Sequence, residues 1–146
     1  MNPVLIFTLG NQVALLCWLA LIAALVIPAA RSAIWRTTGL IVPSIMACGY
    51  VALILAGRAE APDGGFGSLL QVRTLFASDA ALAAGWLHYL AFDLFVGTWI
   101  SRTGLHAGVP RLLILACLPL TFLAGPVGLL AFGILWVGRG MWSGRP

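Results

Sequence analysis

Two ionisable residues, His88 and Asp93, lie inside one long apolar stretch of the chain. Ionisable side chains are costly in such a stretch and usually face the interior of a helical bundle or a cavity. An imidazole and a carboxyl group can exchange protons with a substrate, which is what general acid–base catalysis requires. On a helix the two residues lie roughly 140° apart, so they cannot point at one spot but could flank a cavity. They form the candidate catalytic pair, and we expect both to face protein rather than lipid.

Other interpretations of these residues are structural or involve a metal. As hydrogen-bonding links between helices, each would contribute ~0.6–2 kcal/mol. A haem held by His88 and His106 is excluded within one chain, because a helix would separate them by roughly 27 Å. A zinc or di-iron site needs at least three ligands in register, which the four acidic residues and two histidines do not supply. We therefore expect no metal and no cofactor.

The composition indicates that a membrane surrounds these residues. Hydrophobic residues make up 62% of the 146 residues and charged residues only 8%, whereas a soluble domain carries roughly 25% charged residues. The eight basic residues are all arginines, scattered singly near the ends of apolar runs. That pattern is typical of membrane-interface anchors and unlike the clustered basic face of a nucleic-acid-binding protein. We predict an integral membrane protein, in a bacterial inner membrane, that binds no nucleic acid.

Four apolar runs must position the chemistry. A helix needs about 20 apolar residues to cross a bilayer, and the runs cover residues of about 5–30, 38–57, 80–100 and 110–137. We predict an all-α, integral membrane four-helix bundle that forms one domain over residues 1–146, with both termini on one side. Pro119 and Pro126 predict a kink in the fourth run. The positive-inside rule leaves the orientation open, because four arginines fall on each side.

The longest connection, between the second and third runs, also has a predicted structure. Residues 68–77 place apolar side chains on one helical face, which is typical of a short helix lying in the membrane interface. Ser78 and Asp79 follow immediately, and both residue types favour the start of a helix. We therefore expect them to cap the third spanning helix.

The third run resembles the signature of one small family of membrane proteins. From Phe76 it reads Phe-Ala-Ser-Asp, then Trp86-x-His88, then Asp93-Leu. The fourth run adds Gly125-Pro126-Val-Gly128, which is similar to a Gly/Cys-Pro-x-Gly element. These features resemble the family of the plant abscisic-acid-deficient-4 protein, which is associated with neoxanthin synthesis.

The resemblance implies cofactor-free carotenoid chemistry. In outline, an epoxide oxygen is protonated, a ring carbon–oxygen bond opens, and a neighbouring proton leaves to give an allene. Asp93 would be the acid and His88 the base, or the reverse. We expect four aromatic residues to bind the substrate and four other residues to help position the site. The binding residues are Trp86, Tyr89, Phe92 and Phe95; the supporting residues are Ser78, Asp79, Arg102 and Pro126. Arg102 is included because Thr98 stands where bacterial-type members are expected to carry an arginine.

The functional prediction is a carotenoid-binding membrane protein that isomerises carotenoid end groups. The alternative is a non-catalytic carotenoid-binding or assembly subunit of a larger membrane complex, and a third interpretation is transport of a small lipid-soluble molecule. The expected partners are a carotenoid or similar long apolar ligand and membrane lipid. The substrate itself, catalysis as opposed to binding, and homo-oligomerisation stay open at this stage.

Overall fold

A computed structural model describes residues 2–143, and within that range the chain is helical with no strand. Four helices are long and apolar enough to cross a membrane, namely Pro3–Val26, Pro28–Glu60, Asp79–His106 and Arg111–Arg139. The all-α, four-helix prediction is confirmed. The elements in chain order are α1 (Pro3–Val26), η1 (Pro28–Ala30), α2 (Arg31–Arg36), η2 (Thr37–Ile41), α3 (Val42–Glu60), α4 (Leu69–Leu75), α5 (Asp79–His106) and α6 (Arg111–Ser143).

The ends of α1 are fixed by local hydrogen bonds. The Asn2 side chain accepts a hydrogen bond from the Leu5 amide, and Pro3 occupies the first turn, where a missing N–H costs nothing. At the other end the Arg31 guanidinium donates to the carbonyl oxygens of Ala24 and Leu25, at 2.9 and 3.3 Å. A cation suits this carboxyl end of a helix. The chain then reverses and returns through α2, the π-helical turn η2 and α3 as one helical span.

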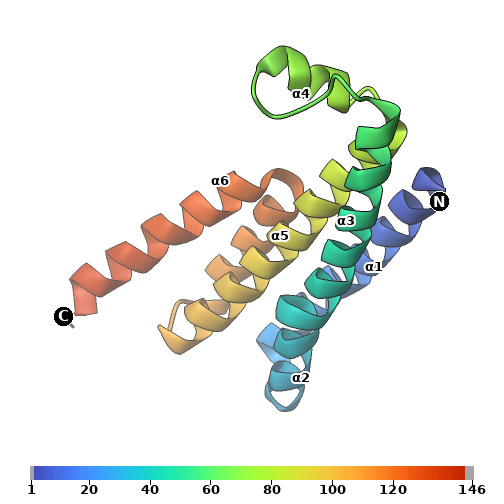
Figure 1. The fold of residues 1–146 in the computed structure, drawn as a ribbon. Coiled ribbons are helices and arrows are strands. Elements are labelled where there is room, and N and C mark those ends of the chain that lie inside the picture. The colour runs from blue at the N-terminus through green and yellow to red at the C-terminus, as the bar shows by residue number, and fades with distance from the viewer. Residues whose placement is uncertain (1, 144–146) are drawn as a thin grey trace.

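The central helix is α5, which packs against α1, α3 and α6 (Figure 1). In its most apolar 18-residue stretch, 56% of the residues are buried, against 11–33% in the corresponding stretches of the other three spans. Small residues allow this close packing: a Cβ atom on Gly57 of α3 would lie 2.6 Å from Cβ of Ala81. The chemistry-bearing residues of α5 therefore lie on the helix that packs most extensively against the other three.

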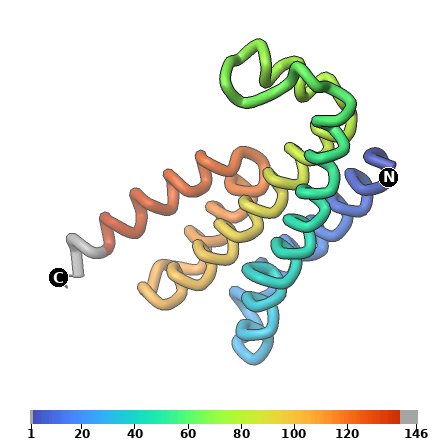
Figure 2. Tube along the Cα trace, viewed as in Figure 1, coloured from blue at the N-terminus to red at the C-terminus, as the bar shows by residue number. Residues whose placement is uncertain are grey.

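The longest helix, α6, is a hairpin rather than a rod. Ala124 has non-helical angles of φ −151° and ψ 54°, and a Cβ atom on Gly128 would collide with the backbone of Thr121. Residues 111–123 run antiparallel to α5, and residues 125–139 return toward the end from which α6 started (Figure 2). The expected kink is present, but it reverses the helix. Pro126 lacks the N–H that would continue the helix, and the glycines let the two arms approach.

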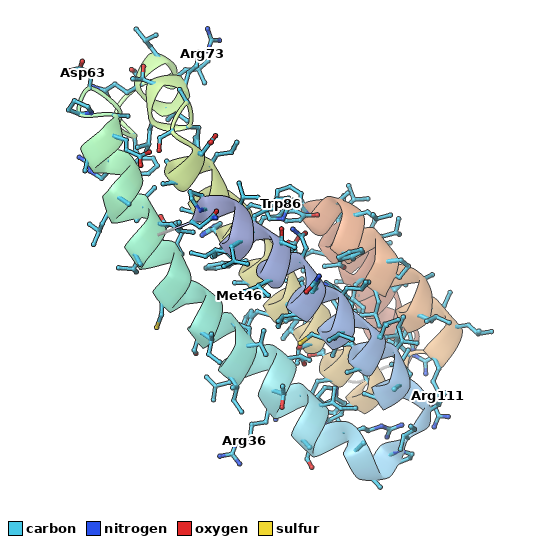
Figure 3. All side chains as sticks on the ribbon, turned by 90° about the vertical axis from the view of Figure 1, so that its right-hand side faces the viewer. Arg36, Met46, Asp63, Arg73, Trp86 and Arg111 are labelled. Atoms are coloured by element: carbon cyan, nitrogen blue, oxygen red, sulfur yellow. The ribbon has the colours of Figure 1, made fainter. Side chains whose placement is uncertain are left out.

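The hairpin places the two ends of the described chain at opposite ends of the bundle. Pro3 lies beside the residues that lead into α4, whereas Arg139 lies against Gly108 in the α5–α6 connection. The described ends therefore differ from the expectation that both termini share one side, and Met1 and residues 144–146 themselves lie outside the described residues. We call the end with Arg139 the arginine end, and Figure 3 shows its Arg36 and Arg111 far from Asp63 and Arg73. The arginine end comprises Arg31, Arg36, Arg102, Arg111 and Arg139.

The connection before α5 folds as the sequence predicts. Within residues 68–77, α4 forms a short helix whose Leu69 and Leu70 are exposed while Leu75 is fully buried. The Ser78 hydroxyl caps α5 by accepting a hydrogen bond from the Ala81 amide. The same hydroxyl donates to the carboxylate of Glu60 at the end of α3. This contact joins the start of α5 to the end of α3.

Candidate functional site

The central helix α5 turns His88 and Asp93 to different faces. Asp93 is half-buried, with its Oδ2 atom fully buried. His88 is exposed, and its ring stacks on Phe92 at a centroid distance of 4.4 Å and lies 5.8 Å from Tyr50. The expectation that both face protein holds for Asp93 and is wrong for His88. Their separation around the helix is the reason, because the face that α6 covers at Asp93 does not extend to His88.

Asp93 lies directly against the break in α6. A Cβ atom added to Gly125 would lie 2.8 Å from Asp93 Cγ and overlap a carboxylate oxygen, so the backbone of the break approaches the carboxyl group closely. Pro126 cannot donate a hydrogen bond to the carbonyl of Phe122, four residues earlier. The Tyr89 hydroxyl donates to that carbonyl instead, at 2.7 Å. One turn of α5 thus supplies both the Tyr89 hydroxyl, which donates a hydrogen bond to the Phe122 carbonyl at the break, and the carboxyl group of Asp93 beside it.

Trp18 of α1 packs against the same contact between α5 and the break in α6. Its side chain is only 4% exposed, its ring lies 5.5 Å from that of Phe122, and it packs on Gly97, one turn beyond Asp93. Trp18 Nε1 and Asp93 Oδ2 are buried polar atoms without a hydrogen-bond partner among the described residues. We call Trp18, Tyr89, Asp93, Phe122 and Gly125 the hairpin-tip site. It offers an N–H donor, a phenol and a carboxyl group in an apolar environment.

Comparison with known proteins places this chain in a family. The family model described as ABA4-like, ABA DEFICIENT 4-like, matches residues 5–132. The chain belongs to the ABA4-like family. The matched range contains the whole hairpin-tip site, and the resemblance predicted from the Trp86-x-His88 and Gly125-Pro126 elements is confirmed. No curated protein and no solved structure gives a significant match.

In this ABA4-like protein the four predicted aromatic residues fall into two groups. Trp86 donates from Nε1 to Asn11 Oδ1 at 3.0 Å, and its ring lies 5.3 Å from that of Tyr89. These two rings lie on the α1 side of α5, with Tyr89 about one turn before Asp93 and Trp86 about two turns before it. Phe92 and Phe95 are exposed on the other side and line a groove against η2 and α3. The structure therefore does not bring all four residues to one place.

The four supporting residues are also dispersed. Pro126 belongs to the break in α6 at Asp93. Ser78 and Asp79 form the first turn of α5, about 20 Å along the helix from Asp93 at 1.5 Å per residue. Arg102 is exposed and lies near the arginine end, where it lines a cavity with Arg36 and His106. Within the described chain, no group of three or more His, Cys, Asp or Glu side chains could hold a metal ion.

Sequence reasoning missed Trp18 and Phe122. A signal existed for Phe122, because a proline inside a helix removes the donor for the carbonyl four residues before it. Nothing in the sequence distinguishes Trp18 from the other tryptophans, since its burial depends on how α1 docks against α5 and α6. Gly125 was recognised only as part of a motif, and its packing against the carboxyl group of Asp93 explains why a side chain does not fit there.

Proposed function

We propose that this protein binds a carotenoid or similar long apolar molecule in the membrane and isomerises its oxygen-bearing end group at the hairpin-tip site. The observation that carries the proposal is the carboxyl group of Asp93, whose buried Oδ2 atom lies beside a broken helix and has no hydrogen-bond partner among the described residues. An unpartnered buried polar atom costs free energy and calls for an explanation such as catalysis. Membership of the ABA4-like family supports a substrate from the carotenoid pathway that leads to neoxanthin and abscisic acid.

The proposed reaction uses Asp93 as both acid and base. In its protonated form, Asp93 gives its proton to the epoxide oxygen of the end group. The bond from this oxygen to one ring carbon breaks, and its electron pair stays on the oxygen as a hydroxyl group forms. The carboxylate then removes a proton from the adjoining chain carbon, and the released electron pair completes the allene. The carboxyl group regains its proton and the product is an isomer, so no cofactor is consumed.

Neighbouring residues supply binding rather than proton transfer. Trp18 Nε1 is available to donate to the oxygen of the end group, and Tyr89 and Trp86 offer aromatic surface to a conjugated chain. We assign no reaction step to His88, because its ring lies on a different face of α5 from Asp93. Of the catalytic pair expected from the sequence, His88 and Asp93, only Asp93 keeps a proposed role in proton transfer. The bacterial inner membrane and a homo-oligomer stay predictions.

The test compares Asp93→Asn with His88→Gln in a host that supplies violaxanthin-like epoxycarotenoids. Both changes are nearly isosteric, and products are measured by chromatography of the extracted pigments. We expect Asp93→Asn to lower turnover by ~10²–10⁴-fold, the usual contribution of a proton-transfer group. We expect His88→Gln to keep most activity, with both variants retaining bound pigment. Near wild-type turnover by Asp93→Asn would contradict the proposal.

The alternative of a non-catalytic carotenoid-binding or assembly subunit is favoured by one observation. Phe92, Phe95 and Trp99 form an exposed aromatic row along the outer face of α5, which a pigment or a partner helix could cover. If this alternative holds, the pigment that co-purifies with the wild-type protein has an unchanged end group. The substitution Asp93→Asn would then leave both the pigment and its amount unaltered.

A further inference from the structure

A groove on the outer face of the bundle ends among the arginines. A cavity of about 340 Å³ lies between α3 and α5 and is lined by Pro43, Ala47 and Phe92. A second cavity, of about 610 Å³, continues it toward the arginine end. The two share Gly39, Leu40 and Phe95, so they form one elongated groove. It lies on the side of α5 away from the break in α6.

The two parts of the groove differ in polarity. The 340 Å³ part is lined almost entirely by apolar side chains. The 610 Å³ part adds Arg36, Arg102 and His106. The four acidic side chains lie elsewhere, since Glu60, Asp63 and Asp79 belong to the opposite end and Asp93 faces the break in α6. Among the described residues, no carboxylate therefore balances the positive charge at this end of the groove.

The π-helical turn η2 shapes the middle of the groove. The Thr38 hydroxyl lies 2.7 Å from that of Thr98, which fixes η2 to α5. A Cβ atom on Gly39 would lie 2.9 Å from Thr98 Cγ2, so the backbone of η2 packs closely on α5. The wider π turn leaves Leu40 and Phe95 61% and 53% exposed along the groove. Such turns are rare and often occur at functional sites.

We infer that this groove binds an anionic phospholipid. Its phosphate lies between Arg36 and Arg102, and one acyl chain follows Leu40 and Phe95 toward Phe92. Arginine recognises phosphate through paired hydrogen bonds, and arginines at the ends of spanning helices lie at the depth of lipid phosphates. A charged end that continues into an apolar groove matches an amphiphile rather than a free anion. The net positive charge favours phosphatidylglycerol over zwitterionic phosphatidylcholine with the same acyl chains.

The inference is tested on the purified full-length protein in a neutral detergent. Native mass spectrometry measures lipid binding, and tryptophan fluorescence measures the melting temperature, as phosphatidylglycerol or phosphatidylcholine is titrated in. We expect phosphatidylglycerol to bind more tightly and to raise the melting temperature more. One basic residue near an anionic lipid surface changes affinity by roughly fivefold. The double variant Arg36→Gln/Arg102→Gln should therefore bind phosphatidylglycerol about 30-fold more weakly.

The matched control is Arg58→Gln/Arg73→Gln, which removes the same charge from the opposite end and should bind like the wild type. A separate variant, Leu40→Asn, tests the apolar part and should weaken phosphatidylglycerol binding without changing any charge. Inorganic phosphate should not compete with the lipid. Equal weakening in the two double variants, unchanged binding by Leu40→Asn, or full competition by inorganic phosphate would each overturn the inference.

Discussion

At the scale of single residues, the hydroxyl of Tyr89 compensates for the proline in α6. Pro126 leaves the Phe122 carbonyl without its helical donor, and Tyr89 supplies one at 2.7 Å. A carbonyl left without a partner inside a membrane protein would cost free energy, because lipid offers no replacement. The hydrogen bond therefore stabilises the break itself as well as the contact between α5 and α6.

Replacing Tyr89 with phenylalanine removes this hydroxyl and little else. We expect Tyr89→Phe to lower the free energy of unfolding by ~1–3 kcal/mol, the usual cost of an unsatisfied buried group. The measurement is denaturant-induced unfolding in detergent micelles. Tyr50→Phe is the control, because Tyr50 is also half-buried and lies near the ring of His88, and its hydroxyl donates to no carbonyl among the described residues. Equal stability of the two variants would show that the Phe122 carbonyl finds another donor.

A second residue-scale prediction concerns the glycine that faces Asp93. A Cβ atom on Gly125 would overlap the carboxyl group, whereas one on Gly133 would meet nothing within 4 Å. We expect Gly125→Ala to lower the free energy of unfolding by ~1–3 kcal/mol, as overpacking does, and Gly133→Ala to have little effect. The same unfolding assay measures both. A tolerated Gly125→Ala would mean that the two arms of α6 adjust without strain.

The sequence predicted the inward position of Asp93 but not the exposure of His88. The positions of Asp93 and His88 depend on two things. The helical period separates the two residues around α5, and the packing of the other helices against α5 decides which of them is covered. The sequence shows that the two side chains point in different directions. It does not show that α6 covers Asp93 while only Tyr50 and Phe92 approach His88.

At the scale of elements, the decisive feature is the reversal of α6. Its second arm packs against one ring of α5: the ring of Trp99 lies edge-on to those of Phe132 and Trp136, at centroid distances of 5.2 and 5.8 Å. The four apolar runs, the short helix α4 and the cap at Ser78 were all visible in the sequence. The reversal was not, because residues 110–137 are long and apolar enough for a span. Two prolines predict a bend without its direction, which the contacts with α5 decide.

Distances between spin labels test the hairpin directly. Cysteines at positions 111 and 139, in a chain whose native cysteines are replaced, would carry the labels. A straight helix would separate these positions by about 42 Å at 1.5 Å per residue. We expect a much shorter distance, since Arg139 reaches Gly108. Labels at 82 and 102 on α5 are the control and should lie about 30 Å apart. A distance near that of the straight helix for 111 and 139 would exclude the hairpin.

At the scale of the whole molecule, the hairpin changes the arginine distribution from which the orientation is predicted. With α6 reversed, Arg139 joins Arg31, Arg36, Arg102 and Arg111 at one end, while Arg58 and Arg73 lie at the other. Within the described chain, the four-to-four tie therefore becomes five to two, with Arg145 lying outside the described residues. The positive-inside rule then predicts that the arginine end faces the cytoplasm.

Cysteine labelling in intact cells tests this orientation. A membrane-impermeant maleimide should react with a cysteine at position 63 from outside, and with one at position 107 only after the membrane is opened. The native cysteines are replaced in both proteins, and an unmodified cysteine-free chain is the control. The opposite pattern would mean that the arginine end faces outward and that the positive-inside rule fails for this protein.

The central position of α5 has a consequence for how the protein is made. The ribosome completes α1 and α3 before α5, yet these two helices barely touch each other and mostly contact α5. After the second crossing, the growing chain is thus two helices that α5 has not yet joined, and Trp18 still lacks Gly97 of α5 and Phe122 of α6, against which it packs. The bundle can therefore assemble only after α5 has been synthesised. Defects on the inward side of α5 should therefore send the nascent chain to membrane proteases, whereas defects on lipid-facing positions of α3 should leave the yield unchanged.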